Sequence, residues 1–381
     1  MGCHAPDPWV KQGRMSRSDP HNARPGILPA AGLTALSEAG AIRAVEPLAP
    51  GQVQPASLDL RLGARAWRVR ASFLPGAQAT VAGKLPQVSL HELDLRGGAV
   101  FEAGCVYVVE LMEALRLPED IAGIANPKSS TGRLDVFTRL ICDRAREFDR
   151  VPAGYDGPLF AEVSPRTFSL LVRTGSRLNQ LRLRRGPVTF GDEDLRALQA
   201  RARVVDGEAD IDQGIALTVD LANSVGGRIG YRAKRHAGLI DIDRVNAYEA
   251  LDYWEPLTAR PNQTLVLDPN EFYILASREA VSIPPDFAAE MVPYNPLVGE
   301  FRVHYAGFMD PGFGYAGAGG KGARIVLEVR SHDVPFILEH GQIIGRLIFE
   351  PLTEAPALVY GQGLGSHYQA QGLKLSKHFR V

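Results

Sequence analysis

The chain has 381 residues, of which 45% are hydrophobic and 22% charged, and its formal net charge is −1. This composition is typical of a globular protein with a sizeable core and two or more domains. The near-zero charge excludes the broad basic surface with which proteins bind long nucleic acids. No apolar run approaches the roughly 18 residues that span a bilayer.

Short alternating segments separated by turns dominate the chain from Gly26 onward, and the 39 Gly and 27 Pro residues supply those turns. Many short strands with close turns predict a mainly β fold built as a barrel or sandwich, with few helices. The first 25 residues are polar and Pro-rich and are expected to form a flexible tail. The expected strands are 56–63, 106–111, 168–172 and 180–183, and the expected helices are 32–40 and 192–204.

Two pairs of segments show that the chain repeats itself. Residues 115–130 resemble 281–296, with prolines and an aspartate at matching positions. Residues 160–183 resemble 326–349, and both copies carry a Glu thirteen residues before a turn Gly. We therefore predict an internal duplication.

The stretch 200–210 is the expected boundary between the two copies. The predicted organisation is a tail over 1–25, a first domain over 26–200 and a second domain over 201–381.

The turn Lys128-Ser129-Ser130-Thr131-Gly132-Arg133 is a candidate phosphate site. Hydroxyls and exposed backbone N–H groups in a Gly-containing turn can line an anion site, and Arg133 adds a permanently charged fork. The alternative is a solvated turn that caps the next element.

Glu328 lies in an apolar, β-branched run, and a desolvated carboxylate there has a raised pKa that suits proton transfer near neutral pH. Simple strand alternation with an outward-facing Glu explains the same pattern. Asp310 precedes it in an Asp-Pro-Gly sequence, which forms a tight turn whether or not it binds anything.

The C-terminal segment 360–372 mixes Gly with Tyr360, His367, Tyr368 and Gln371. It could fold over a ligand, with aromatic faces and amide donors, or be a disordered terminus.

These segments together resemble the dCTP deaminase family, whose fold is the dUTPase-like β-barrel (β-clip). The match covers most of 30–372 in two tandem copies. Lys128 stands where Arg is commoner in that family, and His367 replaces a Lys. The segments that carry the resemblance are 54–63, the Ser-Ser-x-x-Arg motif in 127–133, the Asp-Pro-Gly turn in 309–315, the Glu strand 325–329, the segment 340–352 and the tail 360–371.

The resemblance implies zinc-independent hydrolysis of the 4-amino group of dCTP, giving dUTP and ammonia for pyrimidine deoxynucleotide synthesis. Glu328 would be the catalytic residue: it would activate a water to attack C4 and then carry protons to N3 and to the leaving ammonia. Mg²⁺ would serve the phosphates, not the deamination. The implied substrate-binding residues are Lys128, Ser129, Ser130, Arg133, Asp310, Tyr360, His367 and Gln371.

The resemblance also brings expectations about partners. A homo-oligomer is expected because the fold usually builds threefold barrels, and feedback inhibition by dTTP is a family property that no residue here reveals. The sequence predicts no membrane or long nucleic-acid partner.

The two copies have lost different parts of the family pattern. In the first, Pro152 stands where the aspartate should be; in the second, Asn295-Pro296 replace the serine pair and Gly299 replaces the Arg. We therefore predict one type of site, built from the first copy's serine turn and the second copy's Glu. Whether these come from one chain or two stays open. Glu162, the first copy's equivalent of Glu328, is expected to be structural.

Two alternatives remain, and a third is excluded. A dUTPase, or a bifunctional deaminase and dUTPase, would give dUMP and pyrophosphate, and 238–244 resembles the dUTPase water-activating loop. A non-catalytic nucleotide sensor or scaffold would keep the fold without the chemistry. Zinc deaminase chemistry is excluded, because the three scattered cysteines lack its Pro-Cys-x-x-Cys pair; their odd number and spacing instead indicate a reducing, cytoplasmic environment.

Overall fold

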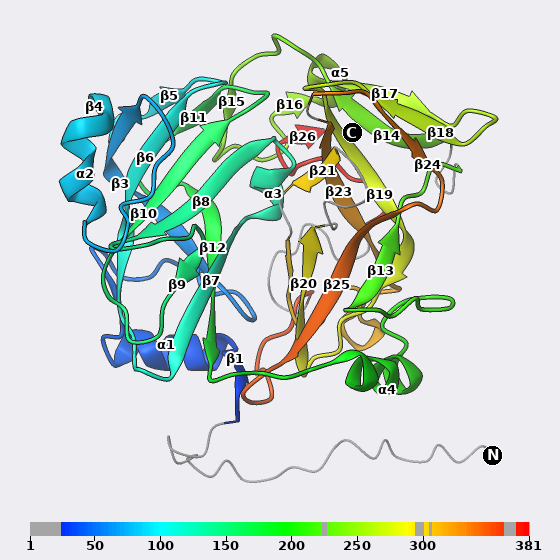
Figure 1. Ribbon diagram of the computed structural model, residues 1–381, viewed down its shortest axis with the longest axis horizontal. Helices are drawn as coiled ribbons and strands as arrows, with labels where there is room; N and C mark the ends of the chain where they lie inside the picture. Colours follow the sequence, from blue (N-terminus) through cyan, green and yellow to red (C-terminus); the bar gives the residue numbers. More distant parts are fainter. Residues whose placement is uncertain are drawn as a thin grey trace.

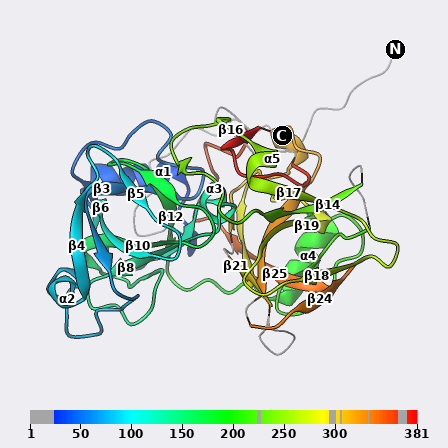
Figure 2. The ribbon, with the colours of Figure 1, turned by 90° about the horizontal axis from the view of Figure 1, so that it is seen from above.

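The computed structural model describes residues 24–222, 227–293, 301–304, 307–331, 333–361 and 371–380. The two halves of the chain lie side by side, and both views separate them clearly (Figures 1 and 2). Most of the expected N-terminal tail lies outside the described residues.

The first half is a ten-stranded, nearly closed barrel whose main path runs β8-β10-β6-β3-β12-β7-β9, with β1, β2 and β4 attached at the sides. Its elements are β1 (Gly26–Ile27), α1 (Ala30–Glu38), β2 (Ile42–Ala44), β3 (Leu58–Val69), α2 (Val81–Val88), β4 (Ser89–Asp94), β5 (Ala99–Phe101), β6 (Val106–Arg116), β7 (Ile121–Pro127), α3 (Ser129–Gly132), β8 (Val136–Cys142), β9 (Arg150–Val151), β10 (Asp156–Pro165), β11 (Leu170–Val172) and β12 (Arg177–Arg185).

The second half contains two main sheets, β17-β14-β19-β23-β21 and β13-β25-β20-β22, and two short strand pairs. Its elements are α4 (Asp192–Ala202), β13 (Ile215–Thr218), β14 (Arg228–Ala233), β15 (Ile240–Asp241), β16 (Tyr248–Glu249), α5 (Ala250–Tyr253), β17 (Trp254–Thr258), β18 (Thr264–Leu267), β19 (Phe272–Val281), β20 (Phe287–Pro293), β21 (Phe301–His304), β22 (Phe308–Met309), the 3₁₀ turn Ala316–Ala318, β23 (Ala323–Ser331), β24 (Phe336–Glu339), β25 (Ile343–Pro351) and β26 (Phe379–Arg380).

The fold class is mainly β with few helices, as predicted. The four expected strands overlap β3, β6, β11 and β12, and the two expected helices overlap α1 and α4. The sequence did not predict α2. Thr80 is the N-cap of this helix, and its hydroxyl accepts a hydrogen bond from the Gly83 N–H at 3.0 Å.

Strand register shows the duplication directly. The antiparallel pair β7–β12 places Pro127 opposite Asn179, and β20–β25 places Pro293 opposite Gly345 at the same offset along the chain. The pairs β6–β10 and β19–β23 agree in the same way, with Glu162 and Glu328 at equivalent positions. The repeat is therefore structural, strand by strand.

The helix α4 packs on the second half. Leu195 and Leu198 are buried in the second hydrophobic cluster, together with Phe287. We therefore propose that the division between the domains precedes α4, about ten residues before the boundary expected from the sequence. The polar flanks that predicted this helix carry no information about which core it covers.

The two halves also share a core. Strand β15 of the second half pairs in parallel with β11 of the first. Trp254 is fully buried, and its ring lies 5.4 Å from that of Phe168 and 5.8 Å from that of Phe379. Buried Arg330 on β23 forms an ion pair with buried Asp135 of the first half. These contacts hold each half in a defined position relative to the other.

Candidate active site

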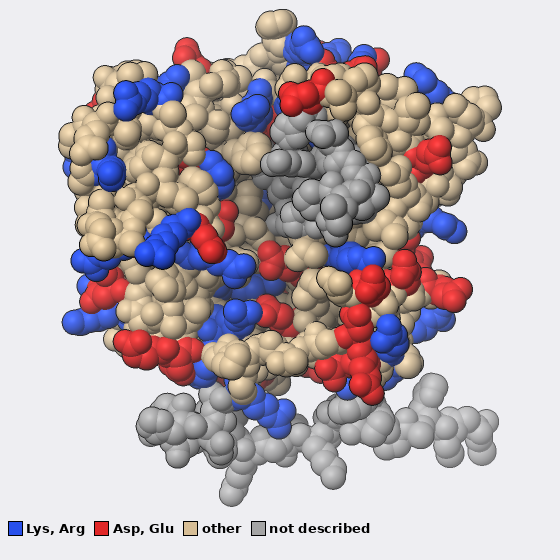
Figure 3. Space-filling model, in the orientation of Figure 1, with Lys and Arg blue, Asp and Glu red and all other residues tan. Residues whose placement is uncertain are grey.

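A pocket of about 340 Å³ lies between the halves and receives side chains from both. Acidic and basic side chains gather along this seam in Figure 3. The expected site residues that line the pocket are Lys128, Ser129, Ser130, Arg133, Asp310, Glu328, Tyr360 and Gln371. His367 lies outside the described residues. One chain therefore supplies both the serine turn and the second half's Glu.

The serine turn is held from three sides. Its one-turn helix α3 joins β7 to β8, and the backbone N–H of Lys128 donates to the Leu178 carbonyl of β12 at 2.9 Å. The hydroxyl of Ser376 donates to the Ser130 carbonyl at 2.7 Å. Ser130 is buried while Ser129 is half-buried, so the turn presents a fixed surface to the pocket.

Glu328 lies in the middle of a sheet, because β23 is paired on one side with β19 and on the other with β21. Its side chain is only 5% exposed. Burial raises the pKa of this carboxyl to about 8, and the Arg133 guanidinium, whose Nε lies 3.9 Å from Oε1, opposes the rise. A carboxyl with this pKa exchanges protons near neutral pH.

Arg133 is turned toward Glu328 and the C-terminal segment. Its guanidinium donates to Oε1 of Gln371 at 3.0 Å and to the Lys374 carbonyl at 3.1 Å. The resemblance implied that Arg133 binds the triphosphate; in the structure its guanidinium also lies beside the Glu328 carboxyl.

Asp310 begins a tight turn in which Phe313 N–H donates to its carbonyl at 3.0 Å, and Gly312 adopts φ +90° at the third position, as a type II turn requires. Burial raises the pKa of its carboxyl, and Arg182, with Nη2 3.3 Å from Oδ1, lowers it. Arg182 also donates to the Ala289 carbonyl at 3.0 Å. An arginine of the first half thus orients an aspartate of the second.

Tyr360 and Gln371 belong to the expected closing arm and are described, whereas His367 and Tyr368 lie outside the described residues. Tyr360 lies with its ring 5.6 Å from that of Phe313, and its N–H donates to the Pro311 carbonyl at 2.7 Å. Gln371 contacts Arg133 and also donates to the Arg324 carbonyl at 3.0 Å. Tyr360 therefore lies at the Asp310 turn, and Gln371 lies at Arg133, the partner of Glu328.

Glu162, the equivalent of Glu328, does not line this pocket. Its Oε1 is paired with Arg139 at 2.5 Å, and Arg139 stacks 3.7 Å from the Phe148 ring. The pairing supports the structural reading of Glu162.

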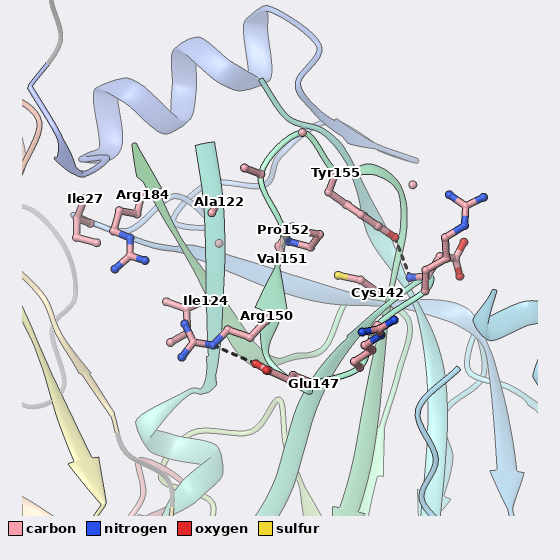
Figure 4. A pocket seen from close by; sticks show the side chains of 18 of the residues that line it. Ile27, Ala122, Ile124, Cys142, Glu147, Arg150, Val151, Pro152, Tyr155 and Arg184 are labelled. Atoms are coloured by element: carbon pink, nitrogen blue, oxygen red, sulfur yellow. Dashed lines mark hydrogen bonds and ion pairs between the residues drawn. The ribbon is translucent and has the colours of Figure 1, made fainter. Parts of the chain in front are cut away.

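The repeat predicts a second site that would contain the first half's counterparts of Asp310 and Glu328. A larger cavity of about 960 Å³ is lined by residues of both halves (Figure 4). Pro152 lines it in place of an aspartate, and Glu162 is not among its lining residues. Its labelled charged groups are Glu147, Arg150 and Arg184. The turn 295–299 that would complete such a site lies outside the described residues. The larger volume of this cavity therefore does not make it the better candidate for the active site.

The segment 238–244 forms a contact between the halves. Asp241 accepts two hydrogen bonds from Arg173, at 2.7 and 2.9 Å, and these bonds lower the pKa of its carboxyl. Asp243 accepts from the Ser176 hydroxyl at 2.7 Å. Neither aspartate lines the pocket. This favours a structural role for the segment over the role of a dUTPase water-activating loop.

Several polar pocket residues were not predicted. Gln54, Arg177, Gln180 and Lys377 line it. Gln54 belongs to the segment 54–63 that carried the resemblance, but the sequence assigned no role to any of the four.

Within the described ranges, no cluster of three or more His, Cys, Asp or Glu side chains is suited to a metal ion. None of the helices described has the length and apolarity needed to cross a membrane.

Two family models match the chain in tandem. The 2'-deoxycytidine 5'-triphosphate deaminase N-terminal domain matches residues 24–187, and the C-terminal domain of the same family matches residues 191–379. Their junction falls immediately before α4.

Curated relatives match parts of the chain. A protein of Methanobrevibacter smithii named "dCTP deaminase, dUMP-forming" is 29% identical over 123 residues, which is 32% of this chain and 59% of that protein. A protein of the same name from Halobacterium salinarum is 29% identical over 184 residues, covering 45% of this chain and 86% of its own length.

A solved structure matches nearly throughout. The crystal structure of 2'-deoxycytidine 5'-triphosphate deaminase from Agrobacterium tumefaciens is 56% identical, with a TM-score of 0.83, and the match covers 86% of this chain and 99% of that one. The chain therefore belongs to the 2'-deoxycytidine 5'-triphosphate deaminase family, in a long form with two tandem dUTPase-like domains.

Proposed function

We propose that the protein deaminates dCTP by hydrolysis, giving dUTP and ammonia. The observation that carries the proposal is the pairing of buried Glu328 with Arg133, at 3.9 Å, in the same pocket as Ser129 and Ser130. A proton-transfer group and a phosphate-binding turn are the two parts that this reaction needs. A buried carboxyl with a raised pKa in a pocket is more typical of a proton-transfer site than of a sensor or scaffold.

The chemistry follows from the position of Glu328. In its ionised form it takes a proton from water, and the hydroxide adds to C4 of cytosine. The protonated Glu328 delivers this proton to N3. It then takes the proton of the new C4 hydroxyl as the carbonyl forms and passes it to the departing amino group, so that one water is consumed and one ammonia released. Positioned acid–base groups contribute about 10²- to 10⁴-fold to such rates. Arg133 keeps the ionised form accessible.

Mg²⁺ is expected to enter with the nucleotide. The two carboxylates that line the pocket are already paired, Asp310 with Arg182 and Glu328 with Arg133. Mg²⁺ commonly takes phosphate oxygens and water when few protein carboxylates are offered. The donor set therefore fits an ion carried on the phosphates.

The names of the curated relatives favour a second candidate, in which the same site also cleaves the triphosphate to give dUMP. On the proposal above, incubation with dCTP yields dUTP and equimolar ammonia without pyrophosphate. Chromatography of the nucleotides with an ammonia assay checks this. Pyrophosphate and dUMP in equal amounts would establish the bifunctional reaction. If no product formed, the protein would be a nucleotide-binding protein without catalytic activity.

The pH dependence of kcat/KM is expected to reflect Glu328. Because the ionised carboxylate is the active form and its pKa is about 8, kcat/KM rises about tenfold per pH unit below pH 8 and levels above it. Arg133 lowers this pKa, so Arg133→Gln should move the rise to higher pH. Initial rates between pH 6 and 10 test both statements. A profile already level at pH 6 would contradict the assignment.

A further inference from the structure

Three cationic side chains from separate parts of the chain meet at one end of the pocket. Lys128 precedes α3, Arg177 begins β12 and Lys377 belongs to the C-terminal segment, and all three line the pocket. Asp59 lies behind them, with Oδ1 2.5 Å from Nζ of Lys128 and Oδ2 3.7 Å from Nη1 of Arg177. Its side chain is 3% exposed and does not line the pocket, so it organises the cations from beneath.

The three cations outnumber the carboxylate behind them. Burial lowers the pKa of Lys377, and neighbouring Lys128 lowers it further, while Asp59 and Asp243 act in the opposite direction. Like charges in a partly desolvated position repel one another more strongly than in water. Arg177 is nevertheless held in place, since Nη1 donates to the Gly51 carbonyl at 3.0 Å. A preorganised group of cations is the arrangement that binds phosphates.

The pocket thus has two chemically distinct ends. Arg133 contacts Glu328, Gln371 and the Lys374 carbonyl, which commits its guanidinium to the catalytic end. The serine turn lies next to Lys128 in sequence. A nucleotide with its base at Glu328 therefore directs its phosphates past the serines toward the three cations.

We propose that Arg177 and Lys377, acting with Lys128 and organised by Asp59, bind the terminal phosphates of the nucleotide and select the triphosphate. The inference rests on the proposed deamination of dCTP. It adds the residues that distinguish a nucleoside triphosphate from a nucleoside monophosphate. A hydrogen bond to a charged group is worth about 10- to 100-fold in affinity, which sets the size of the expected effects.

The first test compares dCTP with dCMP as substrates of Lys377→Met and Arg177→Met. Each variant should lower kcat/KM for dCTP about 10- to 100-fold and leave that for dCMP nearly unchanged. Lys377→Arg keeps the charge and should retain most of the preference. Arg185→Met is the matched control, because Arg185 lies at the far end of β12 in a pair with Asp120 at 2.9 Å. Equal losses with both substrates would overturn the proposal.

A second measurement separates this inference from the proposed reaction. Calorimetry with inorganic tripolyphosphate, which has no base, reports on the phosphate end alone. Wild type should bind it, and Lys377→Met should bind it about 10- to 100-fold more weakly. If dCTP is deaminated but the affinity for tripolyphosphate is unchanged in the Lys377 and Arg177 variants, the assignment of the phosphate subsite is wrong. If tripolyphosphate binding depends on them and no nucleotide is deaminated, the subsite stands and the proposed function is wrong.

Discussion

A Glu328→Gln variant is expected to lose dCTP deamination by about 10²- to 10⁴-fold in kcat while still binding the nucleotide. The amide keeps the shape of the side chain but can neither accept a proton from water nor return it. Ammonia release measures the loss, and calorimetry with dCTP shows that the pocket is intact. Activity within a few-fold of wild type would remove Glu328 from the mechanism.

Glu162→Gln is the matched control for this variant. The two glutamates occupy equivalent strand positions and are similarly buried, but Glu162 is paired with Arg139 and does not line the pocket. Its activity per folded molecule should equal that of wild type. If both variants lost activity to the same extent, the distinction between a reactive and a structural copy would be wrong.

A Trp254→Ala variant is expected to lower the free energy of unfolding by about 3–5 kcal/mol, as removal of a buried Trp typically does. Trp254 is fully buried between Phe168 of the first half and Phe272 and Phe379 of the second, so the cavity opens at the seam. Urea unfolding followed by circular dichroism measures the change. Deamination should also weaken, because the pocket draws on both halves.

Leu251→Ala provides the control on the neighbouring turn. Its side chain is 63% exposed, and exposed substitutions of this kind usually change stability by no more than about 0.5 kcal/mol. If Trp254→Ala lowered the free energy of unfolding no more than Leu251→Ala, the Trp254 ring would not couple the two halves.

The strands and the repeat were predictable because they depend on local order. Alternation marks a half-buried strand wherever it lies, and a repeat is visible as matching letters. Glu328 and Ser130 were likewise predicted because each stands within a motif of a few residues. The prediction of one site built from both halves needed only two observations. The first half has Pro152 in place of the aspartate, and the second half has Gly299 in place of the arginine.

Other residues in or behind the pocket depend on contacts that no local pattern contains. Arg182 stands between two leucines of a strand and resembles an outward-facing residue, yet the second half covers that face and buries it. Lys377 lies beyond the expected arm and reaches the pocket only because β26 pairs with β16. The direction of Arg133 also depends on where Gln371 is placed. Tertiary contacts decided these positions.

The serine turn and the reactive carboxyl are joined by one polypeptide, and this has a consequence for dilute solutions. Two parts linked in this way meet at an effective local concentration set by the linking chain and not by the amount of protein dissolved. The number of complete pockets therefore scales in simple proportion to the number of folded chains. Association between copies, whatever its strength, is not a precondition for bringing the turn and the carboxyl together.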